Sequence, residues 1–224
     1  MINWAGSAVL LSLVFFGCQR TSGSEQARYY DDGRLKPSVA LIPIIDSTEP
    51  ISSWSLSEEL TQSMVHKLNA HGKLFLVDKN KAKGVYNQLG SSHNPFGNQL
   101  DWIKSACRGQ DFAVFMELIE HEEVPLLTRQ DDDPDKCAAQ LNISLRIRVI
   151  DLRVDEPKII LQEIIHDRHH IPRPFTKFHF HQEPWGKESF SISPMGLAHA
   201  QLVKEVSSRI EAYILLTVQA SKGF

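Results

Sequence analysis

The sequence predicts an α/β fold, a mixed sheet with the element order β-α-β-α-β-β-β-α and helices packed on the sheet. Two short and almost wholly apolar runs, residues 39–45 and 74–77, flank an amphipathic helix, which is the alternation of a parallel strand-helix-strand unit. A later run, residues 141–149, alternates apolar and polar side chains and is typical of an antiparallel strand with one wet face. The sheet should therefore begin parallel and end antiparallel.

The first helix is expected to begin after Ser55, which forms an S-x-x-E capping box with Glu58. Its apolar residues repeat every four positions and give one buried stripe: Leu56, Leu60, Met64 and Leu68. Gly72 follows as the expected C-terminal cap. In the strand before this helix, Pro43 cannot donate a ladder hydrogen bond and indicates an edge or a bulge.

The remaining elements follow in order along the chain. Residues 79–89 and 99–107 predict two short helices, and residues 111–119 a third buried strand. Residues 158–166 are expected to pair with the alternating strand. The last element, residues 194–218, is a strongly amphipathic helix whose expected inward residues are Leu197, Leu202, Val206, Ile210 and Ile214.

The composition is that of an ordinary globular protein, with 224 residues, 42% hydrophobic and 23% charged. A formal net charge of −3 disfavours a dedicated nucleic-acid binder, which would be clearly basic.

The first 17 residues are dominated by an apolar run that is too short to span a membrane but suits a secretory signal. Gly17 and Cys18 follow it, and the segment resembles the lipobox of bacterial lipoproteins. That resemblance implies cleavage before Cys18, acylation of Cys18 with palmitate, and a membrane anchor. The alternative is a chance apolar start with a buried Cys18.

Residues 18–37 are polar and without period, so we expect a flexible tether, followed by a single α/β domain over residues 38–224. In lipoproteins of two-membrane bacteria, a residue such as Gln19 implies sorting to the outer membrane. The resemblance therefore implies a lipid-anchored domain that faces the periplasm.

Several segments within residues 39–162 resemble the TolB amino-terminal domain, LpoB and CsgG: VALIPIIDSTE, SLSEELTQSMVHKL, GKLFLVDK, GQDFAVFMELIE, LRIRVIDLR and EPKIILQEI. More narrowly, the chain resembles outer-membrane lipoproteins of intracellular Gram-negative bacteria. The LpoB-like pattern implies binding of another envelope protein, with regulation of the peptidoglycan machinery as a candidate role. The CsgG-like alternative is a subunit of a secretion or pore assembly, which needs two hairpins per subunit. Residues 167–193 do not match the pattern.

The sequence contains no phosphate-binding loop, dinucleotide fingerprint or nucleophile elbow, so we expect no enzyme, no cofactor and no small-molecule substrate. His121 and Glu122 begin like H-E-x-x-H, but Pro125 stands where the second histidine ligand would be.

Five of the ten histidines lie within residues 166–181. An alternating strand there would place His179 and His181 on one side, where they could hold zinc or copper together with His169 and an oxygen ligand from Asp167 or Glu183. The alternative is a half-buried strand whose imidazoles face water or a partner and titrate between about pH 5 and 8.

Aromatic residues concentrate in the same part of the chain and form our candidate for partner recognition: Phe175, Phe178, Phe180, Trp185 and Phe190. The alternative is a loop that folds back to close the core.

In an oxidising periplasm, Cys107 and Cys137 are candidates for one disulfide, with two buried free thiols as the competing outcome.

Overall fold

In the computed structural model, the described residues are 27–49, 54–90, 93–127, 133, 137–172 and 185–221. Their strands form a six-stranded sheet in the order β3-β1-β4-β5-β6, and β2 pairs with β4. The strands are β1 (Ser38–Leu41), β2 (Ile45–Asp46), β3 (Phe75–Leu76), β4 (Phe112–Pro125), β5 (Ala139–Asp151) and β6 (Lys158–Ile171). Pairing is parallel among β1, β2, β3 and β4 and antiparallel from β4 to β6, which confirms the predicted mixed sheet.

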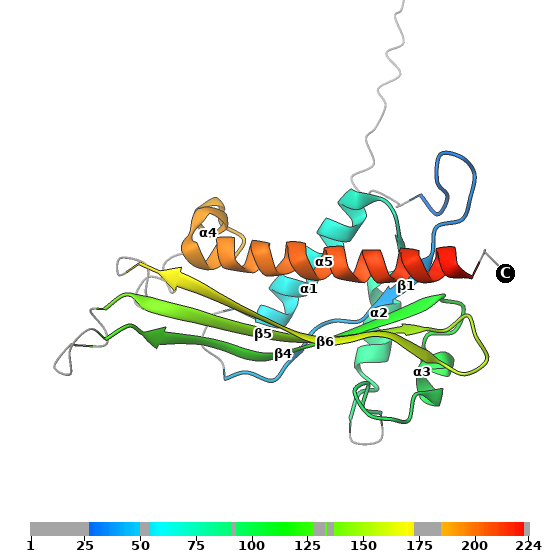
Figure 1. Ribbon diagram of the computed structural model, residues 1–224, viewed down its shortest axis with the longest axis horizontal. Coiled ribbons are helices and arrows are strands. Elements are labelled where there is room, and N and C mark those ends of the chain that lie inside the picture. The colour runs from blue at the N-terminus through cyan, green and yellow to red at the C-terminus, as the bar shows by residue number, and fades with distance from the viewer. Residues whose placement is uncertain are drawn as a thin grey trace, which may run out of the picture.

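Helices cover both faces of this sheet (Figure 1). On one face lie α1 (Leu56–His71), α4 (Glu188–Ile192) and the long α5 (Pro194–Ala220). On the other face, at the end of the sheet near β1 and β3, lie α2 (Lys79–Tyr86) and α3 (Asp101–Ala106). Each layer has its own core of buried side chains, so the predicted packing of helices on the sheet is confirmed.

The predicted caps of α1 are both present. The Ser55 hydroxyl accepts a hydrogen bond from the Glu58 backbone N–H at 3.2 Å, which satisfies one of the free donors at the helix start. Gly72 ends the helix with φ of 67°, in the left-handed region that favours glycine. The stripe of four apolar residues on α1 is fully buried, which fixes the helix face that points to the sheet.

Pro43 lies where the first predicted strand divides into β1 and β2. Because β1 pairs with strands on both sides, the proline marks an interruption inside the sheet rather than an edge. The edge is instead β3, which is only two half-buried residues long. The prediction of a second buried strand over residues 74–77 was therefore correct only in part. Leu74 is buried, but Phe75 and Leu76 are half-buried, and among the described strands nothing pairs beyond β3.

The prediction of a wet outer face on β5 was also wrong, because Ser144 and Arg148 on that face are buried and Asn142 and Arg146 are half-buried. Arg148 points to that face but is only 4% exposed, because the loop at residues 93–97 folds over it. Its guanidinium donates to the carbonyl oxygens of Pro95, Phe96 and Gly97 at 2.8, 3.0 and 2.6 Å, and to the amide oxygen of Gln162 at 2.5 Å. The Arg148 side chain thus holds the loop at residues 93–97 against the outer face of the sheet.

The long helix α5 was predicted nearly to its bounds, with one wrong inward residue. Leu202, Val206, Ile210 and Ile214 are fully buried, whereas Leu197 is 58% exposed. The buried side chains of the first turn are Met195, Ala198 and His199. The apolar stripe therefore starts one position away from Leu197, on a neighbouring face of the helix.

The part of the predicted tether that is described, residues 27–37, has structure of its own. Tyr29 bridges to Leu35 around a turn, and the Tyr30 hydroxyl donates to the Lys73 carbonyl oxygen at 2.6 Å. This turn therefore docks beside the end of α1. Residues 18–26 of the predicted tether lie outside the described residues. The signal segment and Cys18 lie outside the described residues. Among the residues that are described, no helix is both long and apolar enough to cross a membrane.

Candidate partner-binding groove above a buried histidine pair

Three helix and strand elements bring ionisable side chains together inside the core. His199 from α5 lies between Glu59 from α1 and His121 from β4, and all three are at most 4% exposed. His199 Nδ1 is 2.6 Å from Glu59 Oε1, and His199 Nε2 is 2.8 Å from His121 Nε2. The Trp54 indole N–H donates to the other Glu59 oxygen at 2.6 Å. Buried polar groups require such partners, and Glu59 has one on each oxygen.

Glu59, His199 and His121 form a row, and the chemistry of these three side chains fixes where the protons lie. A carboxylate only accepts, so His199 donates from Nδ1 to Glu59, and one proton is shared between the two facing Nε2 atoms. Burial, together with the neighbouring His199, lowers the pKa of His121 to about 3, so His121 is neutral at physiological pH. His121 Nδ1 has no hydrogen-bond partner among the described residues. The row therefore joins α1, α5 and β4 at a single buried point.

A groove of about 590 Å³ lies directly above this row, between α1 and the segment that leads into α5. Glu59 and His199 form part of its floor, and the remaining lining comes from three segments: Gln62, Ser63, His66 and Lys67 on α1, residues 185–191, and Gly196, Ala200 and Val203 on α5. A second hollow of about 580 Å³ continues between the same two helices and is lined by Lys67, Lys204 and their neighbours.

The residues at the start of α5 fix the position of the groove wall that α4 forms. Ser193 caps α5 by accepting from the Gly196 N–H at 3.1 Å, and Pro194 occupies the first turn, where no backbone donor is needed. A Cβ on Gly196 would lie 1.9 Å from the Phe190 carbonyl oxygen, so only glycine lets α4 pack this closely on α5. The serine, proline and glycine together hold Phe190 against the core.

The structure separates the two described members of the predicted aromatic recognition set. Phe190 is 6% exposed, with ring centroids 5.4 Å from Trp54 and 5.9 Å from His199, so it closes the core. Trp185 is half-buried, packs partly against the same core, and also lines the groove. Phe175, Phe178 and Phe180 lie outside the described residues. For Phe190, the alternative of a core-closing loop describes the structure better than an interface.

The rim of the groove is basic. Lys67 and Lys187 line the main groove and Lys204 the adjoining hollow. Within the described part of the chain, none of these three lysines forms an ion pair. Glu188 is the exposed acidic residue of the main groove. Glu205 lines the adjoining hollow, where it pairs with Arg209 at 2.6 Å. The groove therefore combines a half-apolar floor with lysines free to meet an acidic ligand.

The predicted disulfide between Cys107 and Cys137 is not formed, and both are free thiols. Cys107 is buried beside Ile150 and Leu152, at the end of β5, whereas Cys137 precedes the start of the same strand. A strand of this length separates its ends by roughly 40 Å, but a disulfide needs Cα atoms within about 7 Å. Only Cys107 is buried; Cys137 is half-exposed, and its thiol donates to the Asp133 carbonyl oxygen at 3.3 Å.

The described histidines of the predicted metal cluster do not gather into a site. His169 pairs with Asp167 at 2.9 Å on one face of β6, and His166 lies 2.7 Å from the Ser144 hydroxyl on the other. Among the described residues there is no group of three or more metal-ligating side chains. His179 and His181 lie outside the described residues, so that part of the prediction is untested.

The sequence alone did not reveal the buried row. Glu59 lies three positions after Leu56 and so falls on the apolar stripe of α1, which was a usable signal for a buried carboxylate. The sequence pattern around His121 resembles only the start of a metal-binding motif, and the pattern around His199 is that of an amphipathic helix. Nothing in the local pattern indicated that these two histidines would meet, since 78 residues separate them.

Comparisons with known proteins point to a family and a fold. The model of a family of unknown function, DUF7499, matches residues 25–218. No curated protein matches the chain. The hypothetical protein CT253 from Chlamydia trachomatis is 24% identical with a TM-score of 0.63, over 80% of this chain and 98% of that one. This similarity shows the fold alone.

Two structures of lipoproteins are more distant. Lipoprotein GNA1162 from Neisseria meningitidis is 12% identical with a TM-score of 0.40, over 78% of this chain and 97% of that one. The LpoB C-terminal domain from Salmonella enterica is 16% identical with a TM-score of 0.34, over 61% of this chain and 86% of that one. Neither similarity is close enough to support an argument about function.

Proposed function

This chain belongs to the family of unknown function DUF7499, and we propose that it is a non-enzymatic, lipid-anchored envelope protein whose α/β domain docks a segment of another envelope protein. The observation that carries the proposal is the groove between α1 and α5, with Trp185 at its side and, on its rim, lysines that form no ion pair with a described residue. Half-buried tryptophans in grooves are common anchor points of protein interfaces.

The charge of the rim indicates what kind of segment docks. Lys67, Lys187 and Lys204 attract acidic side chains, while the floor beside Trp185 accepts an apolar one. The occupant is therefore an acidic, amphipathic segment of the partner. Glu59 and His199 lie at the floor with their hydrogen bonds already made to Trp54 and to each other, so they support the groove rather than perform chemistry.

The proposed location rests on the start of the sequence. The apolar run before Gly17 and the following Cys18 support acylation of Cys18, and Gln19 supports outer-membrane sorting with the domain in the periplasm. A partner within the peptidoglycan machinery is the finer form of the proposal, taken from the resemblance to LpoB.

The geometry favours a binding module over a subunit of a pore or secretion assembly. The long strands β4, β5 and β6 form one continuous meander whose inner face is covered by α1 and α5. On their outer face, Arg146 pairs with Glu117, and Arg148 is enclosed by the loop at residues 93–97. These arginines are already engaged within the domain.

The docking proposal is tested by affinity capture with the full chain from solubilised envelopes, read by mass spectrometry. Trp185→Ala and the double rim variant Lys67→Glu/Lys204→Glu are expected to lose the same captured protein. The matched control is Tyr213→Ala, an aromatic residue of α5 that is 43% exposed and outside the groove. Because Trp185 also touches the core, the rim variant is decisive: unchanged capture by the rim variant would overturn the proposal.

The anchor is tested separately by metabolic labelling with a palmitate analogue. Label on the natural chain and none on Cys18→Ser is the expected result. Equal labelling of both chains, or no label on either, would overturn the lipid anchor while leaving the groove untouched.

A further inference from the structure

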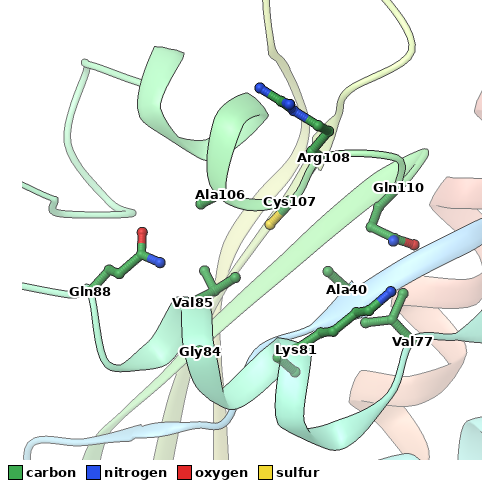
Figure 2. Close-up of a pocket in the computed structure, with 11 residues that line it drawn as sticks. Ala40, Val77, Lys81, Gly84, Val85, Gln88, Ala106, Cys107, Arg108 and Gln110 are labelled. Atoms are coloured by element: carbon green, nitrogen blue, oxygen red, sulfur yellow. The ribbon is translucent and has the colours of Figure 1, made fainter.

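The helices α2 and α3 lie on the opposite side of the sheet from α1 and α5 (Figure 1). A separate hollow, lined by residues of α2 and by the residues that follow α3, lies on this side (Figure 2). Its volume is about 200 Å³. The floor is apolar and made of Ala40, Val77, Ala82, Val85 and Cys107. A hollow of this size is too small for a drug-sized ligand, which needs about 300 Å³ or more, but it admits a small charged group.

The polar groups around this hollow are all donors or neutral. Lys81 lies on its α2 side, Arg108 extends outward from the opposite rim, and Gln88 and Gln110 flank the opening (Figure 2). No carboxylate among the described residues lines the hollow, although Asp101 lines the adjoining one. In the described part of the chain, neither Lys81 nor Arg108 forms an ion pair or a side-chain hydrogen bond.

The floor adds no negative charge. Burial raises the pKa of the Cys107 thiol to about 12, so it stays protonated at any physiological pH. Two cations at the rim of an apolar floor are therefore unopposed by any anion among the residues that the structure describes. Such an arrangement favours an anionic ligand.

Gly84 leaves one wall of the hollow open. It lies in the middle of α2 at an exposed position and lines the hollow. Its φ is not positive, and a Cβ built on it meets no atom within 4 Å, so neither the backbone nor the packing requires glycine there. A larger side chain at this position therefore tests whether the hollow is the binding site.

We propose that this hollow binds a phosphate group, with the Lys81 ammonium on one side, the Arg108 guanidinium closing over the mouth, and Gln88 and Gln110 donating from their amides. Phosphate oxygens only accept, so they match a ring of ammonium, guanidinium and amide donors. Arg108 is exposed, and an exposed side chain changes rotamer within nanoseconds, which lets its guanidinium swing over a bound group.

The phosphate could belong to a soluble phosphomonoester or to a phospholipid head group, and the test separates them. The full chain is titrated by calorimetry with inorganic phosphate and glycerol 3-phosphate. In parallel it is sedimented with vesicles of phosphatidylglycerol in phosphatidylcholine, against vesicles of phosphatidylcholine alone. Binding in the first arm identifies a soluble source, and binding to the anionic vesicles identifies a head group.

Three variants decide whether the hollow is the site. Lys81→Gln and Gly84→Leu are expected to weaken binding at least tenfold, the first by removing charge and the second by filling the space. Lys83→Gln removes the same charge from the same helix outside the hollow and is the matched control, expected to change binding less than twofold. Gly84→Leu also improves helix propensity, so misfolding does not explain its loss.

The proposal is overturned if neither arm shows binding at millimolar phosphate or at saturating vesicle. It is overturned equally if Lys83→Gln weakens binding as much as Lys81→Gln, because the interaction is then a general attraction to the lysines of α2. Neither outcome bears on the groove beside Trp185, which lies on the other face of the sheet.

Discussion

Glu59 Oε1 accepts a hydrogen bond from His199 Nδ1 at 2.6 Å, which joins the first helix of the domain to the last across 140 residues of sequence. The two side chains are 2% and 3% exposed, so water does not substitute for either partner. Because an isolated buried charge is costly, the pair stabilises only the arrangement in which α1 and α5 lie side by side. It also lies under the groove, whose shape depends on the same two helices.

Replacing Glu59 with glutamine is expected to lower the free energy of unfolding by about 3 kcal/mol, because one partner of a buried pair loses its charge. Glutamine also turns an N–H donor toward Trp54 or His199, both of which donate to Glu59. Denaturant unfolding at pH 7 measures the change. The control is Glu58→Gln on the same helix, where the exposed carboxylate should matter by no more than about 0.5 kcal/mol. Equal effects of the two variants would contradict a structural role for the pair.

His121 predicts a loss of stability in acid. Its pKa is lowered to about 3 in the folded protein from an ordinary 6.5, so the unfolded chain binds a proton here at a pH where the folded chain does not. Stability contributed by neutral His121 is therefore present above about pH 6.5 and falls by about 1.4 kcal/mol per pH unit as the pH drops toward 3.

The measurement is the free energy of unfolding between pH 6 and pH 4 in the natural chain and in His121→Gln, whose amide does not titrate. We expect the slope of the natural chain to be steeper by about 1.4 kcal/mol per pH unit. Parallel slopes for the two chains would show that His121 does not carry the effect.

Arg148→Met is expected to release the loop at residues 93–97. It removes a guanidinium that donates to three backbone carbonyl oxygens and to Gln162, so the free energy of unfolding should fall by about 3 kcal/mol. Hydrogen exchange and limited proteolysis at residues 93–97 follow the loop itself. Arg146→Met, two residues away on the same strand, removes an ion pair whose arginine is 38% exposed. It also removes a cation–π contact at 4.2 Å from the Phe96 ring but no hydrogen bond to the loop, so it should cost about 1 kcal/mol. A loop equally protected in both variants would refute the role of Arg148.

The two described cysteines are expected to differ sharply in reactivity. Cys137 is half-exposed and should be alkylated by N-ethylmaleimide in the folded protein, whereas Cys107 is buried with its pKa raised to about 12 and should react only on unfolding. Peptide mass mapping after a short pulse at pH 7 distinguishes them. Because both cysteines are free thiols, the mass map should be the same with and without a reducing agent. A disulfide-linked peptide that joins Cys107 to Cys137 before reduction would contradict the structure.

Most elements were predictable because their signals are local. Ser55 and Gly72 cap α1 through contacts within one helical turn, and the α5 stripe from Leu202 to Ile214 is a property of periodicity. Leu197 was misplaced because it is large and apolar, whereas the four-residue spacing from Leu202 to Ile214 extends back to the small Ala198. The prediction that the outer face of β5 is wet failed for a different reason. Alternation of apolar and polar residues indicates which side chains are polar, but it does not indicate which other segments cover them.

The sequence by itself determined the mixed character of the sheet, the order of most of its strands and helices, and the buried stripes of α1 and of most of α5, because spacing of apolar residues dictates which face leaves water. Only the tertiary structure decided that Glu59, His121 and His199 form one buried row, that Cys107 and Cys137 lie at opposite ends of β5, and that Gly84 borders a hollow. These relations join residues far apart in the chain, and the free energy that selects them comes from burial of the whole core rather than from any local pattern.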